Sequence, residues 1–152
     1  MGLTSGHGEP THRAAPAVPR MTPGQVEAFL RQPRMASLIT MRADGRPTAA
    51  PLWFEWADGV ARMFSGRATG KVQRLLRDSR AALTVTAGVG ELPAWVTIEG
   101  TASVVTGGAD LARRLAPLYH GEEFAEKAIA RLDNDPDGLC LITISPTRIS
   151  HW

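Results

Sequence analysis

The sequence predicts a mainly β (α+β) fold, a six-stranded antiparallel barrel with short peripheral helices. Segments with the alternating period of strands recur along the chain, and Asp-Gly pairs at 44–45 and 58–59 mark tight hairpin turns between them. The helical patterns are few and short, and they do not alternate with strands as they do in parallel βαβ units. A length of 152 residues suits one domain with a single core.

The chain begins with a stretch rich in proline and glycine, residues 1–20, which has no apolar period and is predicted to be a disordered tail. The folded domain is predicted to cover residues 21–152. It opens with a short amphipathic helix, because Thr22 suits an N-cap, Pro23 suits the first helical position, and apolar residues recur at helical spacing up to Leu30.

The remaining elements follow from the apolar periods. Strands are predicted at residues 36–41, 47–56, 60–65, 81–86, 95–105 and 139–149. Further helices are predicted at residues 69–78, 107–119 and 124–132. Gly100 falls inside a long strand, where a glycine indicates a β-bulge or the close approach of another backbone.

Composition excludes several classes of function. The 17 Lys and Arg residues nearly balance 15 Asp and Glu residues and are scattered, so no nucleic-acid partner is indicated. No stretch reaches the ~18 apolar residues of a membrane helix, and the N-terminus lacks the apolar core of a secretory signal, so we expect no membrane contact and a cytoplasmic location. Cys140, the only cysteine, is expected to be a small buried residue of the last strand. The four histidines lack ligand spacing, so no metal is expected.

The segment 64–71, Phe-Ser-Gly-Arg-Ala-Thr-Gly-Lys, carries the strongest chemical signal because it links the end of a strand to the start of a helix. A helix start presents unpaired backbone N–H groups and the positive end of the dipole, which favour an anion. Ser65 and Thr69 add hydroxyl donors, Lys71 adds a compact charge, and Gly70 allows close backbone approach. The pattern indicates a phosphate site.

An ordinary structural reading of the same segment stays open. Thr69 would then be a simple N-cap, and Arg67 and Lys71 would be solvated surface charges. The segment is not a Walker-type P-loop, because Val72 follows the lysine where that motif needs Ser or Thr, and the chain has no GxGxxG motif.

Landmarks in a fixed order resemble those of one known family from residue 21 to 152. They are Phe29-Leu30, the strand Leu38 to Met41, Asp44-Gly45-Arg46-Pro47, Pro51-Leu52-Trp53-Phe54, Ser65, Lys71 with Leu75, Arg77-Asp78-Ser79-Arg80, Ile98-Glu99-Gly100-Thr101-Ala102, Pro146, Arg148 and Trp152. The chain resembles the flavin-binding split β-barrel proteins of the pyridoxamine 5′-phosphate oxidase-like superfamily, in particular the small deazaflavin-dependent members. The resemblance implies a six-stranded split β-barrel of the FMN-binding type.

The resemblance also implies a homodimer with two cofactors in clefts at the subunit interface. The Ser65 and Lys71 positions would hold the cofactor phosphate, and the strand that ends at Trp53 would lie along the tricyclic ring. The vitamin-B6 oxidases of the superfamily carry arginine at the position of Ala49, and the chain lacks their C-terminal substrate-binding pattern, which argues against that activity. The predicted cofactor-binding residues are Ala50, Pro51, Leu52, Trp53, Ser65, Arg67, Thr69, Gly70, Lys71 and Trp95.

Other aromatic residues have open roles. Trp53 and Trp95 suit either a ring pocket or the core, with Trp95 able to reach the neighbouring subunit's cofactor, whereas Trp56 is expected in the core. Trp152 either closes a barrel mouth or frays as a terminus. His120, before Gly121, is expected to be a cation at a helix C-terminus.

The function expected from the resemblance is that of an oxidoreductase that uses coenzyme F420 to transfer hydride to or from a small or medium-sized organic substrate. FMN is the alternative cofactor, because one phosphate site serves both. A non-catalytic flavin carrier and a barrel without a redox cofactor also stay open. Arg31, Arg34 and Arg67 suit either an anionic cofactor tail or plain surface charge. No residue is singled out as a catalytic acid or base.

Overall fold

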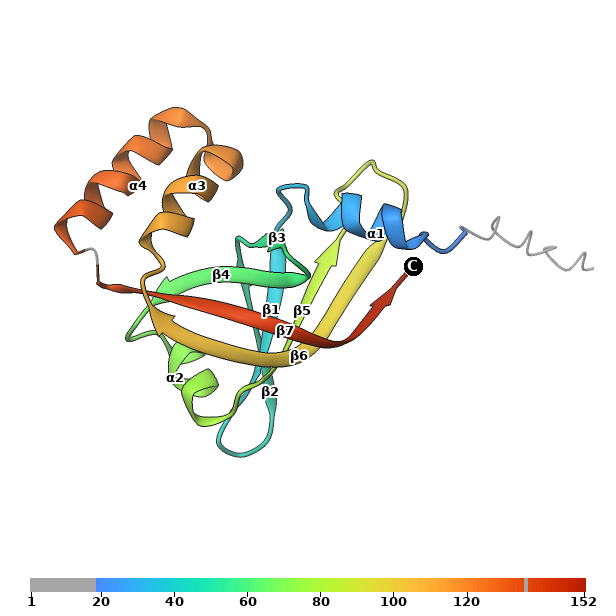
Figure 1. The fold of residues 1–152 in the computed structure, drawn as a ribbon, viewed down its shortest axis with the longest axis horizontal. Coiled ribbons are helices and arrows are strands. Elements are labelled where there is room, and N and C mark those ends of the chain that lie inside the picture. The colour runs from blue at the N-terminus through green and yellow to red at the C-terminus, as the bar shows by residue number, and fades with distance from the viewer. Residues whose placement is uncertain (1–18, 136) are drawn as a thin grey trace, which may run out of the picture.

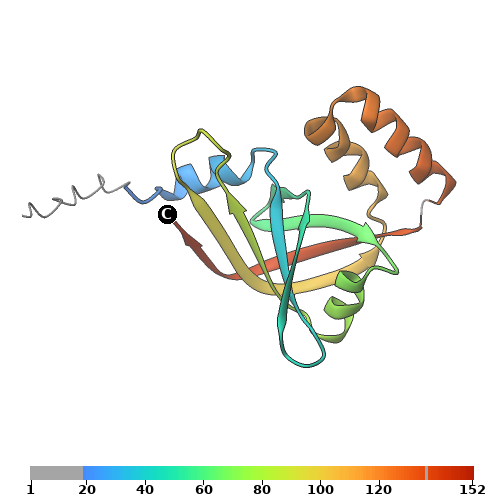
Figure 2. The ribbon, with the colours of Figure 1, turned by 180° about the vertical axis from the view of Figure 1, so that it is seen from behind.

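The computed structural model describes residues 19–135 and 137–152, so most of the predicted tail at 1–20 lies outside the described residues. Seven antiparallel strands form one sheet in the order β2-β1-β5-β6-β7-β4-β3, curled into a half-barrel with helices around it (Figures 1 and 2). The elements in chain order are α1 (Pro23–Leu30), β1 (Ala36–Met41), β2 (Pro47–Leu52), β3 (Glu55–Ala57), β4 (Val60–Gly66), α2 (Gly70–Arg77), β5 (Arg80–Thr86), β6 (Trp95–Thr106), α3 (Ala109–His120), α4 (Glu122–Asn134) and β7 (Leu139–His151). The predicted mainly β barrel is confirmed.

The number of strands is seven rather than the predicted six, because the segment expected as one strand at 47–56 is two. β2 pairs with β1, whereas β3 pairs with β4 at the other edge of the sheet. Trp53 and Phe54 lie between them and join the two edges of the sheet. The break curls the sheet, since the chain crosses from one edge to the other within two residues.

The core lies inside the curl and is built from alternate residues of the strands. In β5 and β6, for example, Leu83, Val85, Val96 and Ile98 are fully buried while their neighbours face outward. The register between β6 and β7 shifts between Glu99 and Gly100, so the predicted bulge is confirmed. Cys140 is buried and free, and Trp56 belongs to the core, both as predicted.

The helices lie at the ends of the half-barrel. α1 begins with the predicted cap: Pro23 is the first helical residue, and Thr22 before it and Gln25 after it form a reciprocal capping box. α3 and α4 form a hairpin inserted between β6 and β7, at the end of the long strands away from α1 and the C-terminus (Figure 1). Within the described chain, none of the helices is long and apolar enough to cross a membrane.

Candidate functional site

Three predicted side chains meet at the junction of β4 and α2. The hydroxyl oxygens of Ser65 and Thr69 lie 2.9 Å apart, and Lys71 Nζ donates to Ser65 Oγ at 3.2 Å. Ser65 is only 7% exposed, whereas Thr69 and Lys71 are half-buried. Two hydroxyls and an ammonium group therefore converge on one point, partly shielded from water, where a charge-assisted hydrogen bond is strongest. We call Ser65, Thr69 and Lys71 the α2 cluster.

Thr69 occupies the N-cap position of α2, but its side chain does not cap the helix. Its hydroxyl turns to Ser65 instead, and within residues 19–135 and 137–152 no side chain accepts a hydrogen bond from the first N–H groups of α2. Thr69 is therefore the N-cap residue by position, but it lacks the side-chain hydrogen bond that a simple N-cap reading expects. An uncapped helix start keeps its N–H groups and its positive dipole end available to an oxyanion.

Arg74, in the last turn of α2, is a further cation whose side chain reaches back to this helix start. Its Nε donates to Oγ1 of the buried Thr40 at 2.8 Å. A methyl group built onto Gly70 would lie 2.9 Å from Arg74 Nη1, so the guanidinium folds over the first residue of the helix. The hydrogen bond to β1 crosses 34 residues of sequence, and no local signal could have shown it.

Arg67 lies in the loop between β4 and α2 and makes hydrogen bonds to the segment that precedes β7. Its backbone N–H donates to Gly138 O, and its guanidinium donates to the main-chain oxygen of Asp137. A neighbouring pocket of about 480 Å³ includes Arg67, Thr69 and the carboxylate residue Asp135 among its lining residues. Arg67 thus braces the loop against the start of β7 in this structure.

Of the residues predicted along the cofactor ring, Ala50, Pro51 and Leu52 lie on the edge strand β2, and Trp53 directly follows it. In the pairing of β2 with β1, Ala50 lies opposite Leu38 and Pro51 lies opposite Ser37. Beyond them, a pocket of about 240 Å³ is lined by Met35, Pro51, Leu52, Trp53 and Phe64. The structure therefore brings Pro51, Leu52 and Trp53 to one apolar pocket, next to the strand that carries Ser65. Flat, mostly apolar walls of this kind suit a planar ring.

Trp53 is packed on several sides by other rings. Tyr119 of α3 stacks on it with ring centroids 5.2 Å apart, and Phe64 meets it edge-on at 5.9 Å. His120, the last residue of α3 as predicted, also approaches edge-on at 4.9 Å and in turn contacts Phe124. Burial raises the pKa of Tyr119 above its ordinary value of 10.0.

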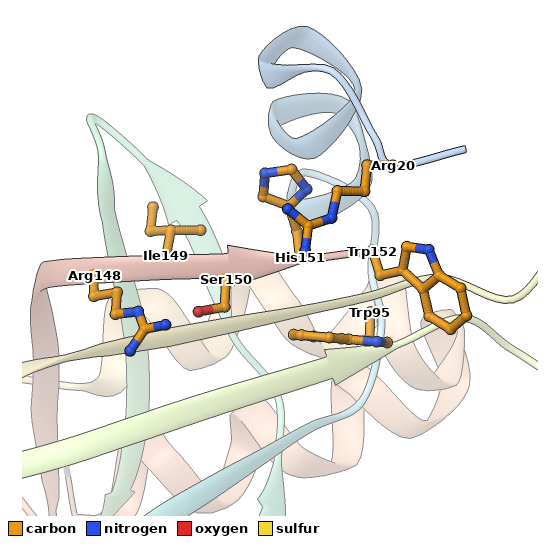
Figure 3. A pocket seen from close by; sticks show the side chains of 7 residues that line it. All are labelled: Arg20, Trp95, Arg148, Ile149, Ser150, His151 and Trp152. Carbon is orange, nitrogen blue, oxygen red and sulfur yellow. The ribbon is translucent and has the colours of Figure 1, made fainter. Parts of the chain in front are cut away.

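Trp95 lies at a different place, in a pocket of about 530 Å³ at the start of β6 (Figure 3). The pocket is lined by Arg20, Trp95, Arg148, Ile149, Ser150, His151 and Trp152. The backbones of Trp95 and Trp152 pair through two hydrogen bonds, so Trp152 closes the end of the sheet rather than fraying. Arg148 and Ser150 point to one side of β7, and Ile149 and His151 point to the other (Figure 3).

The Trp95 pocket and the α2 cluster are far apart within one chain. Ser65 pairs with Cys140 on β7, whereas Val96, next to Trp95, pairs with His151. At strand spacing these positions are about 35 Å apart along β7. A mononucleotide is shorter than that, so the predicted cofactor residues fall into two groups that one protomer does not bring together.

Arg31 and Arg34, considered for an anionic tail, both make ion pairs. Arg31 pairs with Glu27 along α1. Arg34 pairs with Glu91 and lies over the ring of Phe29, 4.4 Å from its centroid. The Arg34 guanidinium also holds the pKa of the Glu91 carboxyl below its usual value. Neither arginine is left without an acidic partner.

A half-barrel whose two edges are joined by a two-residue crossing is a split barrel, and in this one several hydrogen-bond donors gather at the start of α2. A family model described as pyridoxamine 5′-phosphate oxidase matches residues 22–152. The chain therefore belongs to the pyridoxamine 5′-phosphate oxidase family of split-barrel proteins. No curated protein matches the chain.

Solved structures agree on the fold. A conserved hypothetical protein from Mycobacterium tuberculosis is 21% identical with a TM-score of 0.70, over 87% of this chain and 84% of that one. An F420 reductase is 21% identical with a TM-score of 0.62, over 82% and 94%. An FAD-binding protein from Mesorhizobium loti is 18% identical with a TM-score of 0.61, over 88% and 95%. At these identities the likeness extends to the fold alone.

Proposed function

We propose that the protein binds a flavin-type cofactor through its phosphate and is an oxidoreductase. The observation that carries the proposal is the α2 cluster at an uncapped helix start. Its donors are two hydroxyls, one ammonium group and the helix N–H groups, with Arg74 folded over Gly70. These donors fit a phosphate group, which accepts several hydrogen bonds and favours positive charge.

The cofactor we propose is coenzyme F420, with FMN as the alternative. Such a ring, when bound, supplies hydride transfer to or from an organic substrate. The chain's own residues would hold the phosphate at the α2 cluster, lay the ring along Ala50 to Trp53, and keep water away with the apolar side chains of Met35 and Phe64. Support for F420 comes from the sequence resemblance and from an F420 reductase among the structures with this fold. We place this chemistry in the cytoplasm, in keeping with a free, buried Cys140.

A side-by-side titration tests the cofactor. The purified protein, stripped of bound small molecules, is titrated with F420, FMN and riboflavin, and binding is followed by ring fluorescence and thermal shift. We expect F420 to bind most tightly, and FMN to bind roughly tenfold or more tighter than riboflavin, because riboflavin lacks the phosphate. Equal affinity for FMN and riboflavin would contradict the phosphate site. Tighter binding of FMN than of F420 would make FMN the cofactor, and binding of none of the three would remove the proposed function.

We also propose a homodimer in which each cofactor lies between the α2 cluster of one protomer and the Trp95 pocket of its partner. The separation of these two groups within one chain supports this arrangement. The outward face of β1, β5 and β6 supports it too, since a hollow of about 290 Å³ there includes Ile39, Met41, Ala82 and Gly100 among its lining residues, together with the charged side chains of Arg80 and Glu99. Small and apolar side chains on a sheet face suit contact with a second copy.

Complementation between two defective variants tests the dimer. Lys71→Ala and Trp95→Ala are each expected to bind cofactor poorly. Co-expressed with different affinity tags, they should form mixed dimers in which one of two sites is intact, restoring about a quarter of the wild-type sites across a random mixture. The measurement is cofactor stoichiometry together with the mass in solution. A monomeric wild-type protein with bound cofactor, or mixed dimers without recovered binding, would contradict the shared site.

A further inference from the structure

Tyr119, the only tyrosine of the chain, fills a gap in the hydrogen bonding of the sheet. Its hydroxyl oxygen lies 2.8 Å from Arg34 O and 3.1 Å from Phe54 O, so its single proton is shared between two carbonyls. The same oxygen accepts the backbone N–H of Phe54 at 3.4 Å. One side chain of α3 thus contacts the segment before β1 and the break between β2 and β3.

Phe54 needs this partner because it lies in the break and is only 2% exposed. The ladders of β2 and β3 end on either side of it, at Leu52 and Glu55, so its backbone groups pair with none of the strands in the described part of the chain. Buried backbone N–H and C=O groups are nearly always paired in folded proteins. The Tyr119 hydroxyl supplies the pairing that a neighbouring strand supplies elsewhere in the sheet.

The ring of the same tyrosine also packs against the indole of Trp53. The two rings are stacked at 5.2 Å with their planes 15° apart, while Phe64 meets the indole from another direction, at 73°. Trp53 and Phe64 are also walls of the apolar pocket beside β2. A ring held by packing and by a fixed neighbouring backbone keeps one orientation, which lowers the entropy lost when a flat ligand is bound.

We propose that Tyr119 is a positioning residue that fixes Trp53 as a wall of the cofactor-ring pocket, which makes the α3–α4 hairpin part of the binding site. The inference rests on the proposed function for the identity of the ring, but the geometry of Tyr119 and Trp53 does not depend on it. Tyr119 is not expected to touch the cofactor. It acts through the indole and through the backbone at Phe54.

The test combines Tyr119→Phe with Trp53→Phe in a double-mutant cycle. Tyr119→Phe keeps the stacked ring and removes only the hydroxyl, so the protein is expected to fold. The matched control is Leu118→Ala, at the exposed residue next to Tyr119 in α3. In the protein without cofactor, Tyr119→Phe should increase acrylamide quenching of tryptophan fluorescence, and the increase should vanish in the Trp53→Phe background. No change in quenching, or the same change with Trp53 absent, would overturn the positioning role.

Ligand binding tests the connection to the cofactor. Tyr119→Phe should weaken FMN binding about fivefold and leave ribose 5-phosphate, which has the phosphate but no ring, unchanged. In the Trp53→Phe background the further loss should be less than about twofold. Equal weakening for both ligands would overturn the proposal, because it indicates a general loss of structure. A wild-type protein that binds neither F420 nor FMN would remove the cofactor ring and the proposed function together, whereas the quenching cycle would still decide whether Tyr119 positions Trp53.

Discussion

Replacement of Lys71 by alanine is expected to weaken the binding of phosphate-bearing flavins by ~1.5–3 kcal/mol, or roughly 10- to 150-fold. Lys71 Nζ lies 3.2 Å from Ser65 Oγ, so its charge is held at the point where the hydroxyls of the α2 cluster converge. The substitution removes that charge but leaves the helix start and both hydroxyls in place. Titration of the variant with FMN and F420, followed by ring fluorescence, measures the effect.

The chain provides its own control for this substitution. Lys127 is the only other lysine, and it lies on α4 in an exposed ion pair with Glu123. Lys127→Ala changes the net charge by the same amount, so it should leave the affinity unchanged if the effect of Lys71 is local. Riboflavin, which has no phosphate, should bind Lys71→Ala and the wild type alike. An unchanged affinity of Lys71→Ala for FMN and F420 would contradict the phosphate site.

The α2 cluster could be predicted because its members are close in sequence as well as in space. Ser65, Thr69 and Lys71 span seven residues across a strand-to-helix junction, and that junction alone dictates their proximity. Arg74 was missed for the opposite reason. The helical period assigns it to the solvent side of α2, and only the folded sheet shows that Thr40 of β1 comes within 2.8 Å of its Nε.

The break between β2 and β3 could not be predicted from the strand pattern. Burial continues to alternate through it, with Leu52, Phe54 and Trp56 facing inward, so the period of two passes across the break unchanged. The partner that allows the break is Tyr119, 65 residues further along the chain. A pattern of neighbouring residues contains no information about a hydrogen bond of that span.

The position of Trp95 in the fold differs from the position that the family resemblance implies for a residue of the same cofactor site. The family resemblance groups it with Ser65 and Lys71, while the register places Ser65 and Trp95 beside positions that are about 35 Å apart along β7. Both statements hold if the site is completed by a second protomer, which is why complementation between Lys71→Ala and Trp95→Ala is more informative than either variant alone.

Substitution of Gly100 by alanine is expected to lower the free energy of unfolding by at least ~3 kcal/mol. A Cβ atom at this position would lie 2.0 Å from Ser145 O and 2.9 Å from Ser145 C, both backbone atoms of β7. Gly100 has no left-handed φ, so the cost is steric and arises because the bulge at Glu99 and Gly100 brings β6 and β7 together. Relief would require the two longest strands of the sheet to separate.

Gly24→Ala is the matched control for Gly100→Ala, because an added Cβ meets nothing within 4 Å in α1 and should stabilise the protein by up to ~1 kcal/mol. Urea unfolding of both variants, followed by circular dichroism, measures the difference. If Gly100→Ala unfolds at the wild-type midpoint, the close approach of β6 and β7 is wrong. The register that places Trp95 beside Trp152 would then be in doubt as well, because β7 reaches the Trp95 pocket only after the bulge. A large loss at Gly100 with a gain at Gly24 would instead support that register, and with it the separation of the two cofactor half-sites within one chain.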